Sequence, residues 1–124
     1  MSRSALAVLI SVAGLLPAAA GDPFTGNLTE PQIRAIKLAT IARFAGTKNT
    51  CPRVHFVEVA SFKAMADTGI GADVIGSTEF SNVVAEAALV AIEKQRENQA
   101  DFCAAVWQLV GPTSIVHWQM LESD

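Results

Sequence analysis

Apolar and polar positions repeat with a helical period along much of the chain. The first clear stretch follows Thr29, a residue type that caps helix N-termini, and ends at Gly46, which favours helix termination. At 100° per residue its larger apolar side chains share one broad arc: Ile33, Ile36, Ile41 and Phe44. The pattern predicts an amphipathic helix that ends near Ala45.

The longest helical pattern runs from Ser77 or Thr78, either of which can cap a helix, to about Asn98. Within Val83–Ile92 only Glu86 is polar. A helix that is apolar on nearly all sides is buried on nearly all sides. We therefore expect this helix to be the central element of the fold.

A further helix is predicted over Ala100–Val110, where Gly111 and Pro112 stop it. Residues 113–124 then fit either a short capped helix or an extended tail laid across the core. Both interpretations remain open from the sequence alone.

Residues 53–67 carry a mixed signal. Valines and a phenylalanine favour a strand over 54–59, whereas the alanines that follow favour a helix. Because a single strand would have nothing to pair with, we interpret 53–67 as a helix with Pro52 in its first turn. The glycine-rich stretch 68–77 is then a connection that holds one short turn of helix.

Four or five helices joined by short links predict an all-α fold, a small four- to five-helix bundle. The sequence contains no internal repeat and no low-complexity segment. The core is expected to use ten side chains: Ile36, Ile41, Phe62, Phe80, Val84, Ala87, Ala91, Phe102, Val106 and Leu109.

The first twenty residues have the pattern of a secretory signal peptide. A cation at Arg3 precedes an apolar run over Ala5–Leu16, and small residues lead to a cleavage position after Ala20. The apolar run is shorter than the ~18–20 residues that a membrane-spanning helix needs, which favours a cleaved signal over a retained anchor. We interpret 1–20 as the signal peptide and 21–124 as one helical domain, located in the periplasm or secreted.

The charge balance excludes one class of partner. The full chain has 9 basic and 12 acidic residues, and without Arg3 the 8 basic residues against 12 acidic ones leave a net charge of −4. The basic residues are scattered along the sequence, so we expect no nucleic-acid partner. We also expect no stable membrane insertion once the signal has been removed.

The two cysteines, Cys51 and Cys103, predict one disulfide. An exported domain of this size with two thiols most simply joins them. The bond closes a loop of 52 residues (51 to 103). In the chain-entropy account such a loop is worth about 4 kcal/mol.

Two alternatives combine these cysteines with the two histidines. Cys51, His55, Cys103 and His117 supply the ligand types of a Cys₂His₂ zinc site, although the second pair is widely spaced. Cys51 with His55 could instead act as nucleophile and base, although no third group is spaced to orient the imidazole. Taken singly, each histidine is interpreted as a surface or partly buried residue.

Three further features are given structural interpretations. Glu86, Glu93 and Glu97 fall along one face of the longest helix and are expected in solvent. The glycines of 69–76 lack the spacing of a dinucleotide-binding loop. Two bulky side chains are expected in the core or at its edge: Trp107 and Trp118.

Two short motifs carry a resemblance. The stretches "CPRVHF" (51–56) and "FCAAVWQLVGP" (102–112) resemble a mostly uncharacterised class of small exported helical proteins of Gram-negative bacteria. That class has a Cys-Pro opening and a later Phe-Cys-Ala followed by Gly-Pro, and the resemblance implies a helical fold without an activity. More loosely, the chain is similar to the acid-stress periplasmic chaperones, which are small helical proteins with one disulfide. It lacks their dense alternation of acidic and basic residues.

These features favour an exported interaction or binding protein without catalytic activity or cofactor. Its partner would be another protein or a small ligand, and a homo-oligomer would offer another use for exposed apolar residues. A periplasmic stress chaperone that loosens in acid is the first alternative. A metal protein or enzyme that uses the two cysteines and two histidines is the second.

Overall fold

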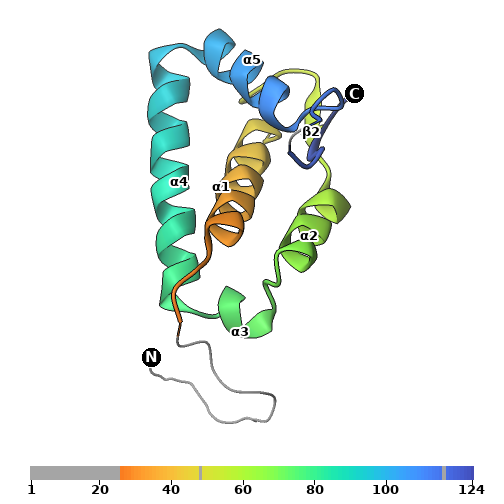
Figure 1. Ribbon diagram of the computed structural model, residues 1–124. Helices are drawn as coiled ribbons and strands as arrows, with labels where there is room; N and C mark the ends of the chain where they lie inside the picture. The colour runs from red at the N-terminus through yellow and green to blue at the C-terminus, as the bar shows by residue number, and fades with distance from the viewer. Residues whose placement is uncertain (1–25, 48, 116) are drawn as a thin grey trace.

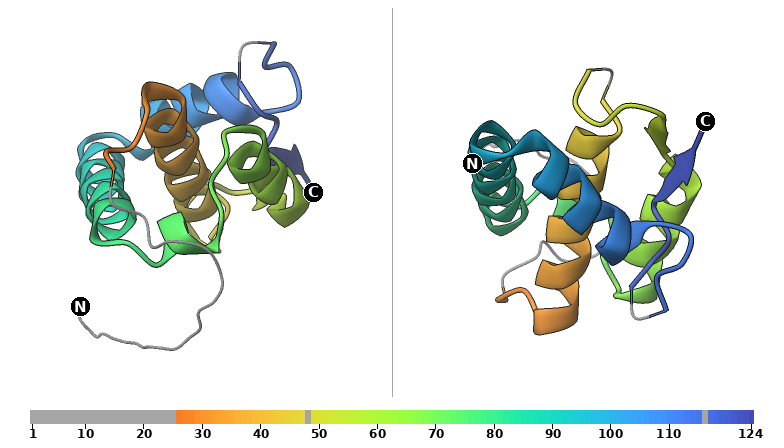
Figure 2. Two further views of the ribbon diagram at one scale, coloured as in Figure 1. Left: turned by 60° about the horizontal axis from the view of Figure 1, so that its bottom comes forward. Right: turned by 90° about the horizontal axis from the view of Figure 1, so that it is seen from above.

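The computed structural model describes residues 26–47, 49–115 and 117–124. In these residues the central helix, α1, has α4 along one side, α2 along the other and α5 across its C-terminal end (Figure 1, Figure 2). The elements follow in this order: α1 Glu30–Ala45, β2 Val54–Phe56, α2 Glu58–Asp67, α3 Ala72–Ile75, α4 Thr78–Glu97, α5 Gln99–Val110 and β3 Leu121–Ser123. The protein is therefore mostly helical, with one small sheet that the all-α prediction did not include.

Helix α1 begins and ends where its capping residues predict. The Thr29 hydroxyl accepts a hydrogen bond from the backbone N–H of Gln32 at 3.3 Å, and the Gln32 side chain accepts one from the Thr29 N–H at 2.9 Å. Gly46 ends the helix beside β2. A Cβ at Gly46 would lie 2.6 Å from the backbone nitrogen of Phe56, so the close approach of α1 to β2 requires glycine.

Helix α1, and not α4, is the central element. It contacts α2, α4, α5 and β2, and six of its residues are buried: Ala35, Ile36, Leu38, Ala39, Ala42 and Ala45. The four alanines let neighbouring elements approach the helix axis closely. The prediction that α4 would be central was therefore wrong.

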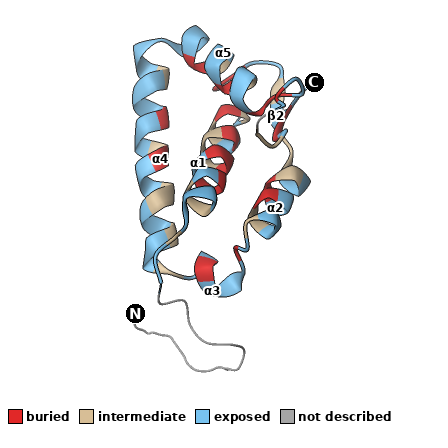
Figure 3. Cartoon of the chain, viewed as in Figure 1, coloured by how far each residue is buried: buried red, intermediate tan, exposed pale blue. Residues whose placement is uncertain are grey.

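Helix α4 lies at the edge of the molecule and is covered from one side (Figure 3). Only Ala87 and Ala91 are buried, whereas Leu89 is 68% exposed and Val90 is 48% exposed. An apolar composition favours burial of a helix but supplies no neighbours to bury it. In a domain this small, α1 and α5 cover one face of α4 and leave the rest of its apolar side chains in solvent.

A strand replaces the beginning of the helix predicted over 53–67. Val54–Phe56 form β2, and α2 begins only at Glu58. The strand has a partner after all, because β3 pairs with it in antiparallel register: Val54 with Ser123, His55 with Glu122 and Phe56 with Leu121. The helix prediction was wrong because the partner lies far away in sequence.

The C-terminal residues form an extended tail across the core, the second of the two interpretations of 113–124. The Met120 N–H donates to the Val110 carbonyl at 2.7 Å, and the Met120 carbonyl accepts from the Val57 N–H at 2.7 Å. The side chains of Met120 and Leu121 are fully buried. The tail therefore joins α5, β2 and the start of α2.

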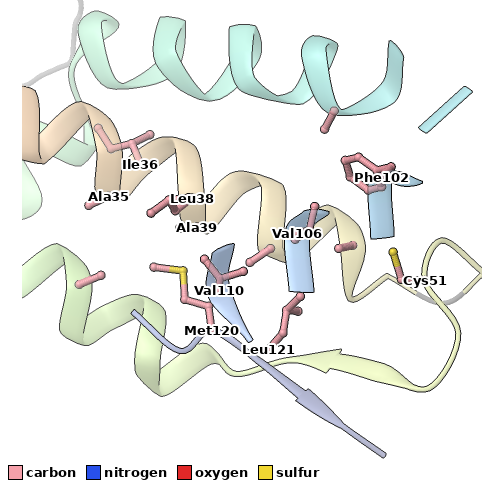
Figure 4. Close-up of a cluster of buried hydrophobic side chains, with 14 of the residues drawn as sticks. Ala35, Ile36, Leu38, Ala39, Cys51, Phe102, Val106, Val110, Met120 and Leu121 are labelled. Atoms are coloured by element: carbon pink, nitrogen blue, oxygen red, sulfur yellow. The ribbon is translucent and has the colours of Figure 1, made fainter. Parts of the chain in front are cut away.

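Half of the ten predicted core residues are buried, three are half-buried and two are exposed. Ile36, Ala87, Ala91, Phe102 and Val106 are buried, while Ile41, Phe80 and Val84 are half-buried. Two expected core residues are exposed instead of buried: Phe62 on α2 is 63% exposed and Leu109 on α5 is 38% exposed. Buried residues that were not predicted include Ile70 and Val74, and also Leu38, Val110, Met120 and Leu121, which Figure 4 labels.

Two further predictions concern the short helices, and one concerns residues that the structure does not describe. The short helix in the glycine-rich connection is α3, and α5 begins at Gln99, one residue before the predicted start. The signal peptide predicted over 1–20 lies outside the described residues. Among the residues that are described, no helix has both the length and the apolar character to cross a bilayer.

Candidate functional site

The two cysteines form a disulfide that joins the loop after α1 to α5. Their Cα atoms are 5.7 Å apart, with Cys51 buried and Cys103 half-buried. Both sulfurs are consumed by this bond, so no zinc site or nucleophile that needs either thiolate is formed in this structure. The same loop is held to the start of α5 by a hydrogen bond from the Gln99 side chain to the Thr50 carbonyl.

The histidines lie in two different settings on the molecule. In β2, His55 places Nδ1 3.1 Å from Asp124 Oδ1 and Nε2 3.3 Å from Glu122 Oε1, so its ring bridges two carboxylates at the C-terminal strand. These groups are about half exposed or more, which limits what the contacts add to stability. His117 lies in the tail, where its backbone N–H donates a hydrogen bond to the Ser114 hydroxyl. In the described part of the chain, no cluster of three His, Cys, Asp or Glu side chains is arranged to hold a metal ion.

The other candidates take the structural roles that the sequence indicated. Glu86, Glu93 and Glu97 are all exposed on α4. Within the glycine-rich connection, Gly69 adopts a positive φ of 77°, a conformation that glycine allows in a sharp turn. Both tryptophans are half-buried and contact the core: Trp107 and Trp118.

An open groove runs over the face formed by α1, α4 and α5. It consists of three adjoining hollows of about 400, 300 and 280 Å³. Ile41 of α1 lines all three, and Val90 of α4 lines the largest and the smallest, so the hollows adjoin one another. We refer to this surface as the α1–α4–α5 groove.

The largest hollow exists because α4 and α5 diverge from a corner. Helix α4 ends at Glu97, and the side chain of the next residue, Asn98, accepts a hydrogen bond from the Asp101 backbone N–H and so caps α5. The two helices separate from this corner (Figure 1). The space between them is lined by apolar side chains: Ile41, Val90, Ala91, Phe102, Ala105, Val106 and Leu109.

Charged residues border the groove. Among the residues that line the hollows, Arg34 and Lys37 belong to α1, Glu86 and Glu97 to α4, and Asp101 to α5. Two further charged residues line the hollows: Glu30 of α1 and Lys94 of α4. Lys94 Nζ lies 3.9 Å from Glu97 Oε1 and offsets part of the negative charge of that carboxylate.

The groove was not predicted from the sequence. Val90 was placed inside a buried helix and Leu109 inside the core, so both were assigned to the interior. One feature of the sequence could have indicated it: α4 has more apolar residues than a helix covered on one face can bury. The sequence could not show which of these residues would remain exposed.

Comparisons with known proteins leave the geometry as the sole guide to function. No protein-family model, curated protein or solved structure matches the chain.

Proposed function

We propose that the chain is an exported, non-enzymatic interaction protein that binds a helical segment of another protein in the α1–α4–α5 groove. The observation that carries this proposal is the apolar surface around Ile41, which lines all three hollows, and Val90, which lines two of them. Contiguous exposed apolar surface bordered by polar residues is typical of interaction sites. The half-exposed state of Val90 supports the proposal, because its apolar surface would be removed from water by a partner.

The shape of the groove favours a helix over a small molecule. Small-molecule sites bury most of the ligand surface in a concave pocket. Here three hollows lie in series along a surface groove that is open to solvent. An amphipathic helix fits such a surface because it buries one face and keeps the other in water.

Export is supported by two features that agree. The signal-peptide pattern of residues 1–20 directs a chain to an oxidising compartment, and disulfides such as Cys51–Cys103 persist there. The disulfide also removes the two thiols that a cysteine-based enzyme would need, which favours a binding role.

The export proposal predicts the mass of the mature protein. When the full chain is expressed in a Gram-negative host, we expect the periplasmic fraction to contain a species that begins at Gly21. Its intact mass should be two hydrogens below that of the reduced chain, because Cys51 and Cys103 are joined. Mass spectrometry before and after reduction measures both quantities. A cytosolic protein that keeps residues 1–20 and has two free thiols would contradict the proposal.

The groove proposal predicts that a charge at one residue of α4 weakens peptide binding, whereas the same charge at the neighbouring residue does not. Val90→Asp places a carboxylate on the apolar floor, and we expect at least a tenfold loss of affinity for a peptide helix with a leucine stripe and uncharged edges. Leu89→Asp is the matched control, because Leu89 is more exposed yet lines none of the three hollows. We expect that variant to bind within twofold of the unaltered protein.

A fluorescence titration with the labelled peptide measures both affinities. Thermal unfolding checks that the two variants fold equally well, as expected for exposed positions. Equal losses in Val90→Asp and Leu89→Asp, or no binding by the unaltered protein, would contradict the proposal.

A further inference from the structure

The exposed face of the β2–β3 strand pair carries a histidine between two carboxylates. His55 lies directly opposite Glu122 in the antiparallel register, and both side chains are exposed. The ring Nε2 lies 3.3 Å from Glu122 Oε1, and Nδ1 lies 3.1 Å from Asp124 Oδ1. Each ring nitrogen therefore faces a carboxylate oxygen of the C-terminal strand. We refer to these three residues as the His55 clasp.

The geometry of the clasp distinguishes between the two protonation states of the ring. A neutral imidazole has a proton on one nitrogen and a lone pair on the other, whereas the imidazolium ion donates from both. An ionised carboxylate only accepts hydrogen bonds, so it cannot supply the missing proton. With a neutral ring, either Glu122 or Asp124 would face a lone pair. Only the cation presents an N–H to both carboxylates.

Other charged groups near β2 do not face the ring. Arg43 and Glu58 form an ion pair with each other at 3.2 Å, and the Arg43 guanidinium lies 4.5 Å from the centre of the Phe56 ring. Successive side chains of a strand point to opposite faces, so Phe56 and His55 lie on different sides of β2. Arg53 precedes the strand and takes part in no ion pair within the described residues.

The clasp acts on the end of the tail that closes the core. Leu121 is fully buried, whereas the residues after it, 122–124, are exposed. The Asp124 N–H donates to the Arg53 carbonyl at 2.9 Å and so joins the end of the tail to the residue before β2. Because residues 122–124 bury little surface, the clasp and these backbone hydrogen bonds are what hold this end to β2.

We propose that His55, Glu122 and Asp124 form a pH-sensitive clasp that holds the C-terminal strand more tightly when the imidazole is protonated. In mildly acidic solution a histidine is protonated while carboxyl groups remain ionised, so both contacts attract. As the pH rises through the range in which histidine loses its proton, one carboxylate comes to face a lone pair and its contact is lost. In strong acid the carboxyl groups become neutral and the clasp weakens again. This inference is independent of the α1–α4–α5 groove.

Hydrogen exchange of the Asp124 amide, measured by NMR, tests the clasp. The observed rate is divided into the intrinsic rate at each pH, which leaves the protection that the strand pair provides. We expect protection about threefold higher at about pH 5.5 than at about pH 8, a modest factor because the groups are exposed. Equal protection at both pH values in the unaltered protein would overturn the proposal.

Two histidine variants assign the effect to one ring. His55→Gln keeps a polar side chain that carries no charge at either pH, and we expect it to give equal protection at both. His117→Gln is the matched control, because His117 also lies in the tail region but takes part in no ion pair of the described residues. That variant should keep the threefold ratio. A ratio that survives in His55→Gln, or that disappears in His117→Gln, would contradict the clasp.

A third variant tests the same contacts from the opposite strand. Glu122→Gln with Asp124→Asn removes both charges and nearly preserves the shapes of the side chains, so it should also abolish the ratio. If His55→Gln abolishes the ratio and this variant keeps it, His55 acts through another group and the clasp is overturned. Thermal unfolding checks that the variants fold, as expected for substitutions at exposed positions.

Discussion

Replacing Cys51 and Cys103 together with alanine is expected to lower the free energy of unfolding by about 4 kcal/mol. The disulfide closes a loop of 52 residues, so its removal gives the unfolded chain more conformational freedom. Small domains have a total stability of ~5–15 kcal/mol, which makes this one of the largest changes available in the molecule. Urea unfolding of the oxidised protein and of the double variant, extrapolated to water, measures the difference.

The denaturant dependence offers an internal check on the mechanism. Without the cross-link the unfolded chain expands and exposes more surface, so the slope of free energy against urea should rise. Reduction of the unaltered protein should produce the same shift as the double substitution. A loss below about 1 kcal/mol would show that the loop is already constrained in the unfolded state.

The second large effect is expected at Met120. Met120→Ala should destabilise the protein by about 2–5 kcal/mol, because it removes a fully buried side chain and leaves a cavity. Its side chain lies in the core beside Val110 and Leu121 (Figure 4). Chemical denaturation measures the loss.

A nearby position in β3, the strand that follows Met120, provides the control. Ser123 is exposed and lies in β3, so Ser123→Ala should change stability by less than about 0.5 kcal/mol. If Met120→Ala costs no more than this control, the C-terminal tail does not pack in solution as the structure places it.

The helices could be predicted because their signals are local. Thr29 caps α1 through its own neighbour Gln32, and Ser77 caps α4 by accepting from the Phe80 N–H at 3.1 Å. Each of these contacts spans three residues. The disulfide was also predictable, since an exported chain with two cysteines offers a single intramolecular pairing.

The strand pair and the position of α4 depend on contacts that a local pattern does not contain. The strand signal at Val54–Phe56 was present, but its partner β3 follows more than sixty residues later. Similarly, the apolar run of α4 indicated burial without showing that α1 would occupy the centre. The groove was missed because of the second error, since it is lined in part by apolar residues of α4 that the fold leaves uncovered.

The pairing of β2 with β3 has a consequence for the timing of folding during biosynthesis. Met120 lies 75 positions after Ala45, the last residue of α1 (120 − 45), and both belong to the same buried cluster. A nascent chain that has produced all five described helices still lacks Met120 and Leu121, so its core cannot close. Contacts this distant in sequence form late, since the intervening chain must first be brought back. A chain that stops at Val110 would therefore lack two of the four largest fully buried side chains, and its core could form completely only once Met120 and Leu121 are present.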